Sequence, residues 1–250
     1  MSANPVRRNC AKPHACPAEV RMKVLATAPL TRDLPEQQRA ELDRTLTSWA
    51  WGEGEPIVLA GAEATGSYIL ASGRARITHD FADGREVTID IAAPGDIIGP
   101  VSTTPAQATH SAWAMETCCA LFLPAEALTE VVATYPPLAL GIIRFQERQL
   151  RQYRQRESAQ LGSTVEQRVA ATLLRLGKRL GATQPDGARL IQARLRREDI
   201  AGMASTTIES ASRAMSKMKR AGLIDSGREW VSLRDLEGLD LLAAGGDEAV

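Results

Sequence analysis

The sequence predicts an α+β protein that consists of an N-terminal antiparallel β-roll or jelly roll, a long helix and a C-terminal winged helix-turn-helix. Three observations support this fold class. Short strand-like runs separated by turn signals fill residues 49–123. An uninterrupted helical pattern follows the prolines at 136 and 137. Two short helical runs near residue 200 precede a further turn and a strand-like run.

The composition excludes some classes of function but does not identify a single one. The 250 residues are enough for two modest domains, and 30 Lys and Arg balance 30 Asp and Glu. The sequence lacks an apolar stretch near the ~20 residues that span a bilayer, and it lacks a signal core, so we expect a cytoplasmic protein without a membrane partner. Phosphate-cradling glycine loops, dinucleotide motifs and paired catalytic acids are absent from the sequence, so we do not expect an enzyme.

Residues 1–30 are expected to form a cysteine-containing N-terminal arm, in which Cys10 and Cys16 stand ahead of any regular structure. Cys10 and Cys16 lie on this polar, proline-rich segment, whereas Cys118 and Cys119 are adjacent in a strand-like run. Burial as a small apolar residue explains one of the adjacent pair, but not two cysteines on a polar arm. Thiolates bind iron–sulfur clusters or zinc, so all four are candidate metal ligands, with zinc, a redox disulfide or no metal as alternatives. His14 is expected to be a solvated arm histidine, with a role as an alternate ligand left open.

The β-roll domain, with its flanking helices, is expected over residues 31–134. Residues 30–47 predict its first helix, capped near Asp33 and with Pro35 in the first turn. The pair Asp83-Gly84 lies between two alternating runs and predicts a tight hairpin. Turn signals at short intervals along this region favour an antiparallel roll.

Residues 135–161 are expected to form one long helix. A heptad-like seam runs along it, made of Ala139, Ile143, Gln146, Leu150 and Tyr153. A seam of this kind packs against a second helix, although a single helix on the surface of the domain is the alternative.

Residues 162–242 are expected to form the winged helix-turn-helix, followed by a frayed tail at 243–250. Thr164 and Gln167 predict a capping box for a helix over residues 165–180. The alternation from Arg189 to Leu195 then predicts a short strand.

The second helix of the motif is predicted to begin near Ile208, with Thr206 or Thr207 as its cap. Its buried stripe is predicted to contain Ile208, Ala211, Met215 and Met218. The opposite face suits a DNA major groove, where arginine bonds guanine, glutamate accepts from cytosine and later cations meet phosphates. The wing after residue 224 favours this interpretation over a solvated amphipathic helix. The candidate DNA contacts are Arg197, Thr206, Thr207, Glu209, Ser212, Arg213 and Lys217.

This region resembles the DNA-binding region of the CRP/FNR transcription regulators, through the run R-x-D-I-A…T-x-E-S-x-S-R…M-K-R-A-G-L-I. The resemblance implies that Glu209, Ser212 and Arg213 are the FNR-type reading triplet for a half-site close to TTGAT. It also implies a parallel homodimer through the long helix, a palindromic site in double-stranded DNA, and RNA polymerase as a partner. Ser205 stands where the family usually has glycine, so a residue with a Cβ must adopt the backbone angle of the turn.

The β-roll region is similar to the cyclic-nucleotide-binding-like domain of that family, including its P-G-D-x-x-G element at 94–99. In the family, a Gly-Glu-Leu cassette and a later Arg-Ser pair hold the nucleotide. This sequence has Gly99-Pro100-Val101 and His110-Ser111 in their places, so the ribose acceptor and the phosphate-binding cation are both missing. We therefore do not expect a cyclic nucleotide, and the roll is interpreted as a scaffold for another signal.

FNR-type oxygen sensors hold an iron–sulfur cluster with an N-terminal cysteine group and one cysteine of the sensory domain. Cys10 and Cys16 match the C-x5-C part of that group, but the additional upstream cysteine is missing. The matching sensory position is Leu121, and Cys119 lies two residues earlier, on the same predicted strand face. Neighbouring strand residues point to opposite faces, so Cys118 and Cys119 both ligate only if the strand is bulged or distorted. The resemblance implies a cluster of the 4Fe-4S type that senses O2, NO or redox state; a regulator that responds to a small molecule in the roll is the alternative.

Overall fold

The computed structural model describes residues 12–245 of the chain. It contains two compact units, and the boundary between them falls after Leu150, within the long helix α4 (Pro136–Gly162). Within residues 12–245, every helix is too short or too polar to cross a lipid bilayer.

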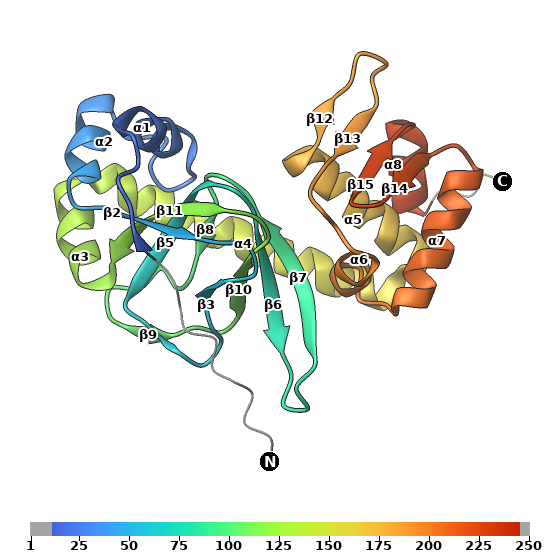
Figure 1. Cartoon of the computed structure of the whole chain (residues 1–250), viewed down its shortest axis with the longest axis horizontal. Helices are drawn as coiled ribbons and strands as arrows, with labels where there is room; N and C mark the ends of the chain where they lie inside the picture. Colours follow the sequence, from blue (N-terminus) through green and yellow to red (C-terminus); the bar gives the residue numbers. More distant parts are fainter. Residues whose placement is uncertain (1–11, 246–250) are drawn as a thin grey trace. The chain divides into compact units, whose positions relative to one another are not determined.

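Antiparallel strands form the β-roll of the first unit. In the described chain the larger sheet has the strand order β1-β2-β11-β5-β8, the second has β3-β10-β6-β7, and β4 pairs with β9. The strands are β1 Lys12–Pro13, β2 Thr47–Trp51, β3 Pro56–Val58, β4 Glu63–Ala64, β5 Gly66–Ser72, β6 Ala75–Asp80, β7 Glu86–Ala92, β8 Ile97–Ile98, β9 Ala106–Gln107, β10 Ser111–Ala114 and β11 Cys118–Pro124. Helices α1 (Ala18–Thr27), α2 (Glu36–Asp43) and α3 (Ala125–Thr134) gather on one side of these strands (Figure 1).

Strand β11 separates two cores, because successive residues of a strand point to opposite faces of the sheet. Cys119 and Leu121 belong to a core that the larger sheet shares with the helices. Cys118 and Ala120 belong to the core inside the roll. The prediction that Cys119 shares a strand face with Leu121 is therefore confirmed.

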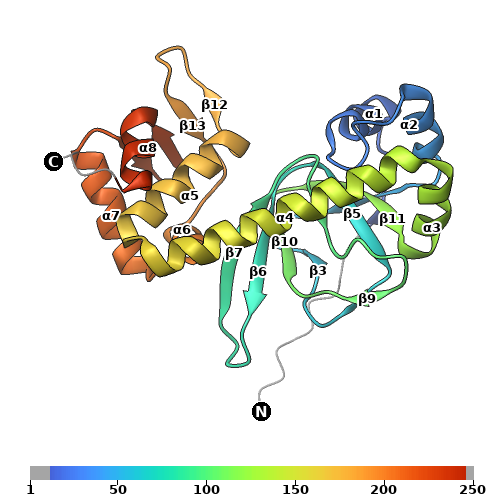
Figure 2. The same cartoon turned by 180° about the vertical axis from the view of Figure 1, so that it is seen from behind.

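The first half of α4 lies against the segment that follows α1, and Figure 2 shows this half beside α3. Gly141 makes the close approach possible, since a Cβ at this position would lie 2.5 Å from the carbonyl oxygen of Leu30. Leu138 is buried in the same core, and Arg144 forms an ion pair with Asp33 at 2.6 Å. Contacts from outside the helix thus fix its first turns.

One helix in the N-terminal region was not predicted, and the bounds of another were wrong. The segment expected to be an N-terminal arm contains helix α1, which buries Val24 and Leu25 but has no side-chain cap to reveal it in the sequence. The helix expected over residues 30–47 is shorter, because α2 begins after Pro35 and ends at Asp43. Asp33 pairs with a cation of α4 instead of capping a helix.

The second unit contains the C-terminal part of α4 and a four-helix, four-strand arrangement within the described residues. Its elements are α5 Val165–Leu180, β12 Ala182–Thr183, β13 Arg189–Ile191, α6 Arg197–Met203, α7 Ile208–Arg220, β14 Ile224–Gly227, β15 Trp230–Leu233 and α8 Leu236–Ala244. The sheet order is β12-β13-β15-β14, so the wing hairpin β14–β15 extends a sheet that begins beside α5.

The capping box at the start of α5 is confirmed: Thr164 Oγ1 accepts from the Gln167 backbone N–H at 3.3 Å, and Gln167 Oε1 accepts from the Thr164 backbone N–H at 2.7 Å. The strand predicted to reach Leu195 ends instead at Ile191, and Arg194 adopts a left-handed conformation with φ 48° that no extended strand allows. Helix α8 was not predicted, and its last residues enter the segment expected to be a frayed tail.

Candidate nucleic-acid interface and metal centre

The turn before α7 has the conformation that the motif requires. Ser205 has φ 50°, in the left-handed region that glycine adopts with the least steric cost. Its hydroxyl accepts from Gln160 Nε2 at 2.8 Å, and Arg168 donates through Nε to the carbonyl of Ala204 at 2.9 Å. Arg168 thus satisfies a carbonyl that the end of α6 leaves free, and Gln160 holds the hydroxyl of the serine in its strained conformation.

Helix α7 begins with a side-chain cap. Thr207 Oγ1 accepts from the backbone N–H of Ser210 at 3.1 Å, so Thr207 is the N-cap and Thr206 precedes it, half-buried. The buried stripe consists of Ala211, Ala214, Met215 and Met218. Ile208, which was predicted to belong to it, is 54% exposed, because its side chain leans toward the N-terminus of the helix and beyond the residues of the core.

The opposite face of α7 carries an exposed ion pair. Arg213 Nη1 lies 3.0 Å from Glu209 Oε1, with 71% and 76% of these side chains exposed. Lys217 forms a second surface ion pair, with Glu166 of α5 at 2.9 Å. Surface pairs of this kind contribute only about 0.2–1 kcal/mol to stability. Breaking either pair so that its cation can contact a nucleic acid therefore costs little free energy. Ser212 directly precedes Arg213 on the helix and is half-exposed.

Arg197 does not join this exposed face. Its guanidinium contacts the sulfur of Met215 and donates to Ser226 Oγ of the wing at 3.3 Å, and burial lowers its pKa. Arg197 therefore links α6, α7 and the wing, and its contact with DNA stays a prediction. Lys219 makes a comparable link, through its ion pair with Asp225 at 2.7 Å. Nothing in the helical periodicity distinguished these two cations from the exposed ones.

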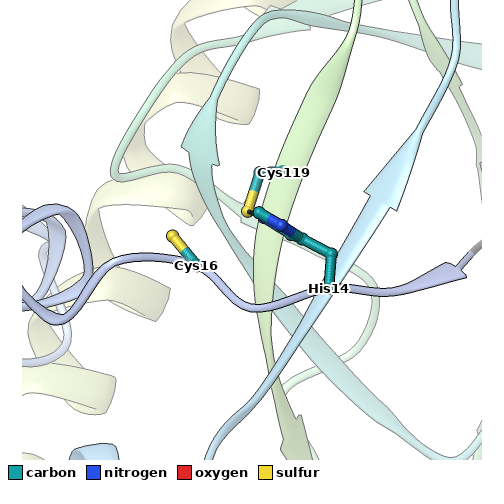
Figure 3. Close-up of side chains that lie close together, drawn as sticks. All are labelled: His14, Cys16 and Cys119. Carbon is teal, nitrogen blue, oxygen red and sulfur yellow. Dashed lines mark hydrogen bonds between the residues drawn. The ribbon is translucent and has the colours of Figure 1, made fainter.

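Three potential metal ligands come together in the first unit. His14 and Cys16 lie on the segment between β1 and α1, and Cys119 reaches them from β11 (Figure 3). Their ligand atoms all lie within 4.8 Å of one another, and His14 Nε2 is 2.9 Å from Cys119 Sγ. Cys16 and Cys119 are buried, while His14 is exposed. His14 is thus exposed, as predicted, and its contact with Cys119 supports the alternative role as a ligand.

Of the four cysteines predicted as metal ligands, Cys118 lies apart from Cys16 and Cys119 in the structure. Cys118 is fully buried inside the roll, where its thiol donates to the backbone carbonyl of Arg74 at 3.1 Å, and burial raises its pKa to about 11. The register of β11 does shift next to Cys119, but this irregularity leaves Cys118 on the opposite face. Cys118 is therefore not part of the site. Cys10 lies outside the described residues.

A positive charge lies close to the thiols. Arg21 of α1 forms a bidentate ion pair with Asp43 of α2, with N–O distances of 2.8 and 2.6 Å. Burial and the adjacent Cys16 raise the pKa of Cys119 to about 12, and the guanidinium of Arg21 acts in the opposite direction. Since metals bind thiolates, binding at this site requires Cys119 to lose its proton, which a cation nearby favours.

The positions that hold a nucleotide in similar rolls have other partners here. Ser111 Oγ donates to Asp80 at 2.6 Å and accepts from the backbone N–H of Ala60 at 2.9 Å. Pro100 offers only its carbonyl, which accepts from Ser67 Oγ at 2.7 Å. Burial lowers the pKa of His110, which disfavours a cation at that position.

The second candidate surface is the exposed side of α4. Five large apolar side chains on this helix are at least half exposed, namely Leu140, Ile143, Leu150, Tyr153 and Leu161. Three of them belong to the predicted seam, and Ile143 and Leu150 are one heptad apart.

Two known protein families match most of the described chain. The family described as "Cyclic nucleotide-binding domain" matches residues 50–135, and the family described as "Crp-like helix-turn-helix domain" matches residues 167–242. The chain is 28% identical over 218 residues to the CRP-like cAMP-activated global transcriptional regulator of Mycobacterium tuberculosis, covering 87% of this chain and 97% of the relative. It is 25% identical over 207 residues to the anaerobic regulatory protein of Haemophilus influenzae, covering 82% of this chain and 80% of the relative.

Solved structures agree with these matches and confirm the predicted fold class. FixK2 from Bradyrhizobium japonicum aligns with a TM-score of 0.70 and 24% identity, over 82% of this chain and 98% of that one. A CRP-family transcriptional regulator from Thermus thermophilus aligns with a TM-score of 0.64 and 27% identity, over 80% of this chain and 99% of that one.

Proposed function

Because the chain belongs to the CRP/FNR family of transcription regulators, we propose that it senses O2, NO or redox state through an iron–sulfur centre and binds a two-fold symmetric DNA site as a homodimer. DNA-binding transcription regulation follows from the family itself, whose members are regulators and not enzymes. The nature of the signal and the sequence of the DNA half-site are proposed. We also propose that RNA polymerase is a partner and that the protein is cytoplasmic.

The exposed pair at the start of α7 supports the proposed DNA contacts. Glu209, Ser212 and Arg213 lie on the side of the helix opposite its buried stripe, and the wing hairpin follows the helix directly. Arginine bonds guanine O6 and N7 bidentately, and glutamate accepts from cytosine N4, each for about 1–3 kcal/mol of discrimination. We propose that Thr206, Thr207 and Lys217 contact the sugar–phosphate backbone. We propose a half-site close to TTGAT.

The exposed apolar side of α4 supports the proposed homodimer. Ile143 and Leu150 are 62% and 51% exposed in the single chain, and burying such side chains against a second copy is favourable. A parallel pair of these helices has a two-fold axis, so both α7 helices would meet half-sites about one helical turn apart.

The donors of the cysteine site are chemically suited to an iron–sulfur centre. Cys16 and Cys119 are buried thiols, the usual ligands of such clusters, and they lie together with the exposed His14 and close to the charge of Arg21. Cys10 precedes them on the same segment and would be a further thiolate ligand. A cluster there would supply reactivity toward O2 and NO, and the chain would transmit its gain or loss through β11 and the helices that share its core.

One experiment tests the sensing and DNA-binding parts separately. The protein is purified without oxygen, assayed for iron and acid-labile sulfide, and titrated against a palindromic TTGAT duplex and a random duplex at physiological salt. A brown protein that prefers the palindrome, and loses this preference or gains it on exposure to air or NO, is the expected result. A colourless protein that still prefers the palindrome contradicts the sensor alone. A protein without preference in any redox state contradicts the assignment of the reading residues.

A small-molecule signal is the second candidate, because the M. tuberculosis relative is named as cAMP-activated. The replacements at Pro100 and His110 argue against the same ligand in this roll. Calorimetric titration with cAMP separates the two functions, since a heat of binding at micromolar nucleotide would favour the second.

A further inference from the structure

We propose that His14 is a protein ligand of the metal centre, so that a mixed imidazole–thiolate set that includes His14, Cys16 and Cys119 holds the metal. This inference rests on the cysteine site of the proposed function, but it does not depend on whether the bound metal is an iron–sulfur cluster or a single ion.

The number of available thiols leads to this assignment. A closed, structural tetrahedral site, or a four-iron cluster with one protein ligand per iron, takes four protein donors. The chain has four cysteines, and Cys118 is excluded because its side chain lies inside the roll and its thiol donates to Arg74. At most three thiolates remain, so one donor of another kind is required. Among the described residues, His14 is the metal-binding side chain that joins Cys16 and Cys119.

The donor atoms lie close enough together to become ligands of a single metal ion. Zinc–sulfur bonds of about 2.3 Å and zinc–nitrogen bonds of about 2.0–2.1 Å place the ligand atoms of one tetrahedral ion roughly 3.5–3.8 Å apart. The three donor atoms here lie within 4.8 Å of one another, and the imidazole Nε2 already contacts the sulfur of Cys119. Only small side-chain movements separate this arrangement from a coordinated one.

The backbone holds His14 and Cys16 in place without help from a metal. The backbone N–H of His14 donates to the carbonyl of Ser48 in β2 at 3.0 Å, and the N–H of Cys16 donates to the carbonyl of His14 at 3.1 Å. Strand β1 pairs with β2 immediately before this segment, and helix α1 begins immediately after it. Strand β2 also pairs with β11, where Ala50 lies opposite Cys119. The segment with His14 and Cys16, and the strand with Cys119, are therefore both held by hydrogen bonds to β2 of the same sheet.

An imidazole ligand changes the chemistry of the centre. A neutral nitrogen in place of a thiolate removes one negative charge from the ligand set, and replacing cysteine by histidine raises the reduction potential of iron–sulfur centres. The direction of this effect would make a cluster at this site easier to reduce than one held by four thiolates.

The test uses Co(II) as a spectroscopic probe of the reduced, metal-free full-length protein under anaerobic conditions, with His14→Ala, His14→Cys and the control His79→Ala. His79 is an exposed histidine on β6, outside the cysteine site. We expect His14→Ala to weaken Co(II) binding at least about tenfold, His14→Cys to restore tight binding with stronger sulfur-to-cobalt charge-transfer absorption, and His79→Ala to bind like the wild type.

The outcomes separate this inference from the proposed function. Unchanged affinity and spectrum in His14→Ala, or no Co(II) binding by the wild type, would overturn the His14 ligand. Pulsed EPR of the iron-loaded, reduced protein supplies a second readout, since a coupled imidazole nitrogen that disappears in His14→Ala supports the inference. Histidine-dependent Co(II) binding by a protein that never acquires iron and sulfide would contradict the iron–sulfur sensor while leaving His14 as a ligand.

Discussion

The DNA-reading helix and the cysteine site differ in how far apart their parts lie along the chain. From the Ser205 turn to the end of α7 at Arg220, cap, buried stripe and exposed ion pair all lie in one short stretch. The cysteine site joins His14 and Cys16 to a cysteine more than one hundred positions later, through the pairing of β1, β2 and β11. Helical spacing suffices for the first site, whereas the second exists only once the sheet has formed.

The largest effect is expected when the two adjacent cysteines are replaced one at a time. Cys119→Ser should remove a donor and reduce metal content by more than about tenfold, because oxygen is a poor replacement for thiolate at such a site. Cys118→Ser should retain the metal, since this side chain lies in the other core. Iron, sulfide and zinc analysis of both purified variants makes the comparison. Equal loss in both would contradict the assignment of the two faces of β11.

The next largest effect is expected from a substitution in helix α7. Arg213→Ala should reduce discrimination for the guanine of the half-site by about 1–3 kcal/mol, or roughly five- to 150-fold, because the bidentate contact is lost. Binding selections over randomised half-sites measure it. Arg234→Ala is a suitable control, since Arg234 forms its ion pair with Asp186 and lies outside α7. An unchanged preference at every base of the site would argue against Arg213 as a reading residue.

A third prediction concerns a glycine whose role is tertiary. Gly141→Ala should lower the free energy of unfolding of the first unit by about 1–3 kcal/mol, because the added Cβ would press against the carbonyl of Leu30. Gly162→Ala, at the end of the same helix, adds a Cβ with nothing within 4 Å and should be neutral or slightly stabilising. Urea unfolding measures both. Equal stability of the two variants would mean that the close approach of α4 is not required.

The smallest effect is expected at the turn before α7. Ser205→Ala keeps the left-handed strain and loses the hydrogen bond from Gln160, whereas Ser205→Gly loses the bond and relieves the strain. The glycine variant should therefore be more stable than the alanine variant by about 1 kcal/mol. Thermal unfolding of the two variants measures the difference. The reverse order would show that φ at this position is not a source of strain.

The predictions from sequence succeeded where one short segment contains all the information. Thr164 and Gln167 defined the start of α5, and the spacing of Ala211, Met215 and Met218 defined the buried side of α7. They did not anticipate what packing decides. Ile208 fits the helical stripe but lies beyond the core, and Arg197 has the same chemistry as Arg213 but is held between α6, α7 and the wing.

Local pattern alone was enough to identify the roll, the long helix, the winged motif and the family, because turn residues, caps and hydrophobic period act within a few residues. Two decisions about the metal site needed the folded chain. The alternation of β11 turns Cys118 into the roll and Cys119 toward the helices, and the pairing of β1 with β2 brings His14 to that second face. No residue type or spacing records which face of a strand meets a distant segment, since that depends on the register of the sheet.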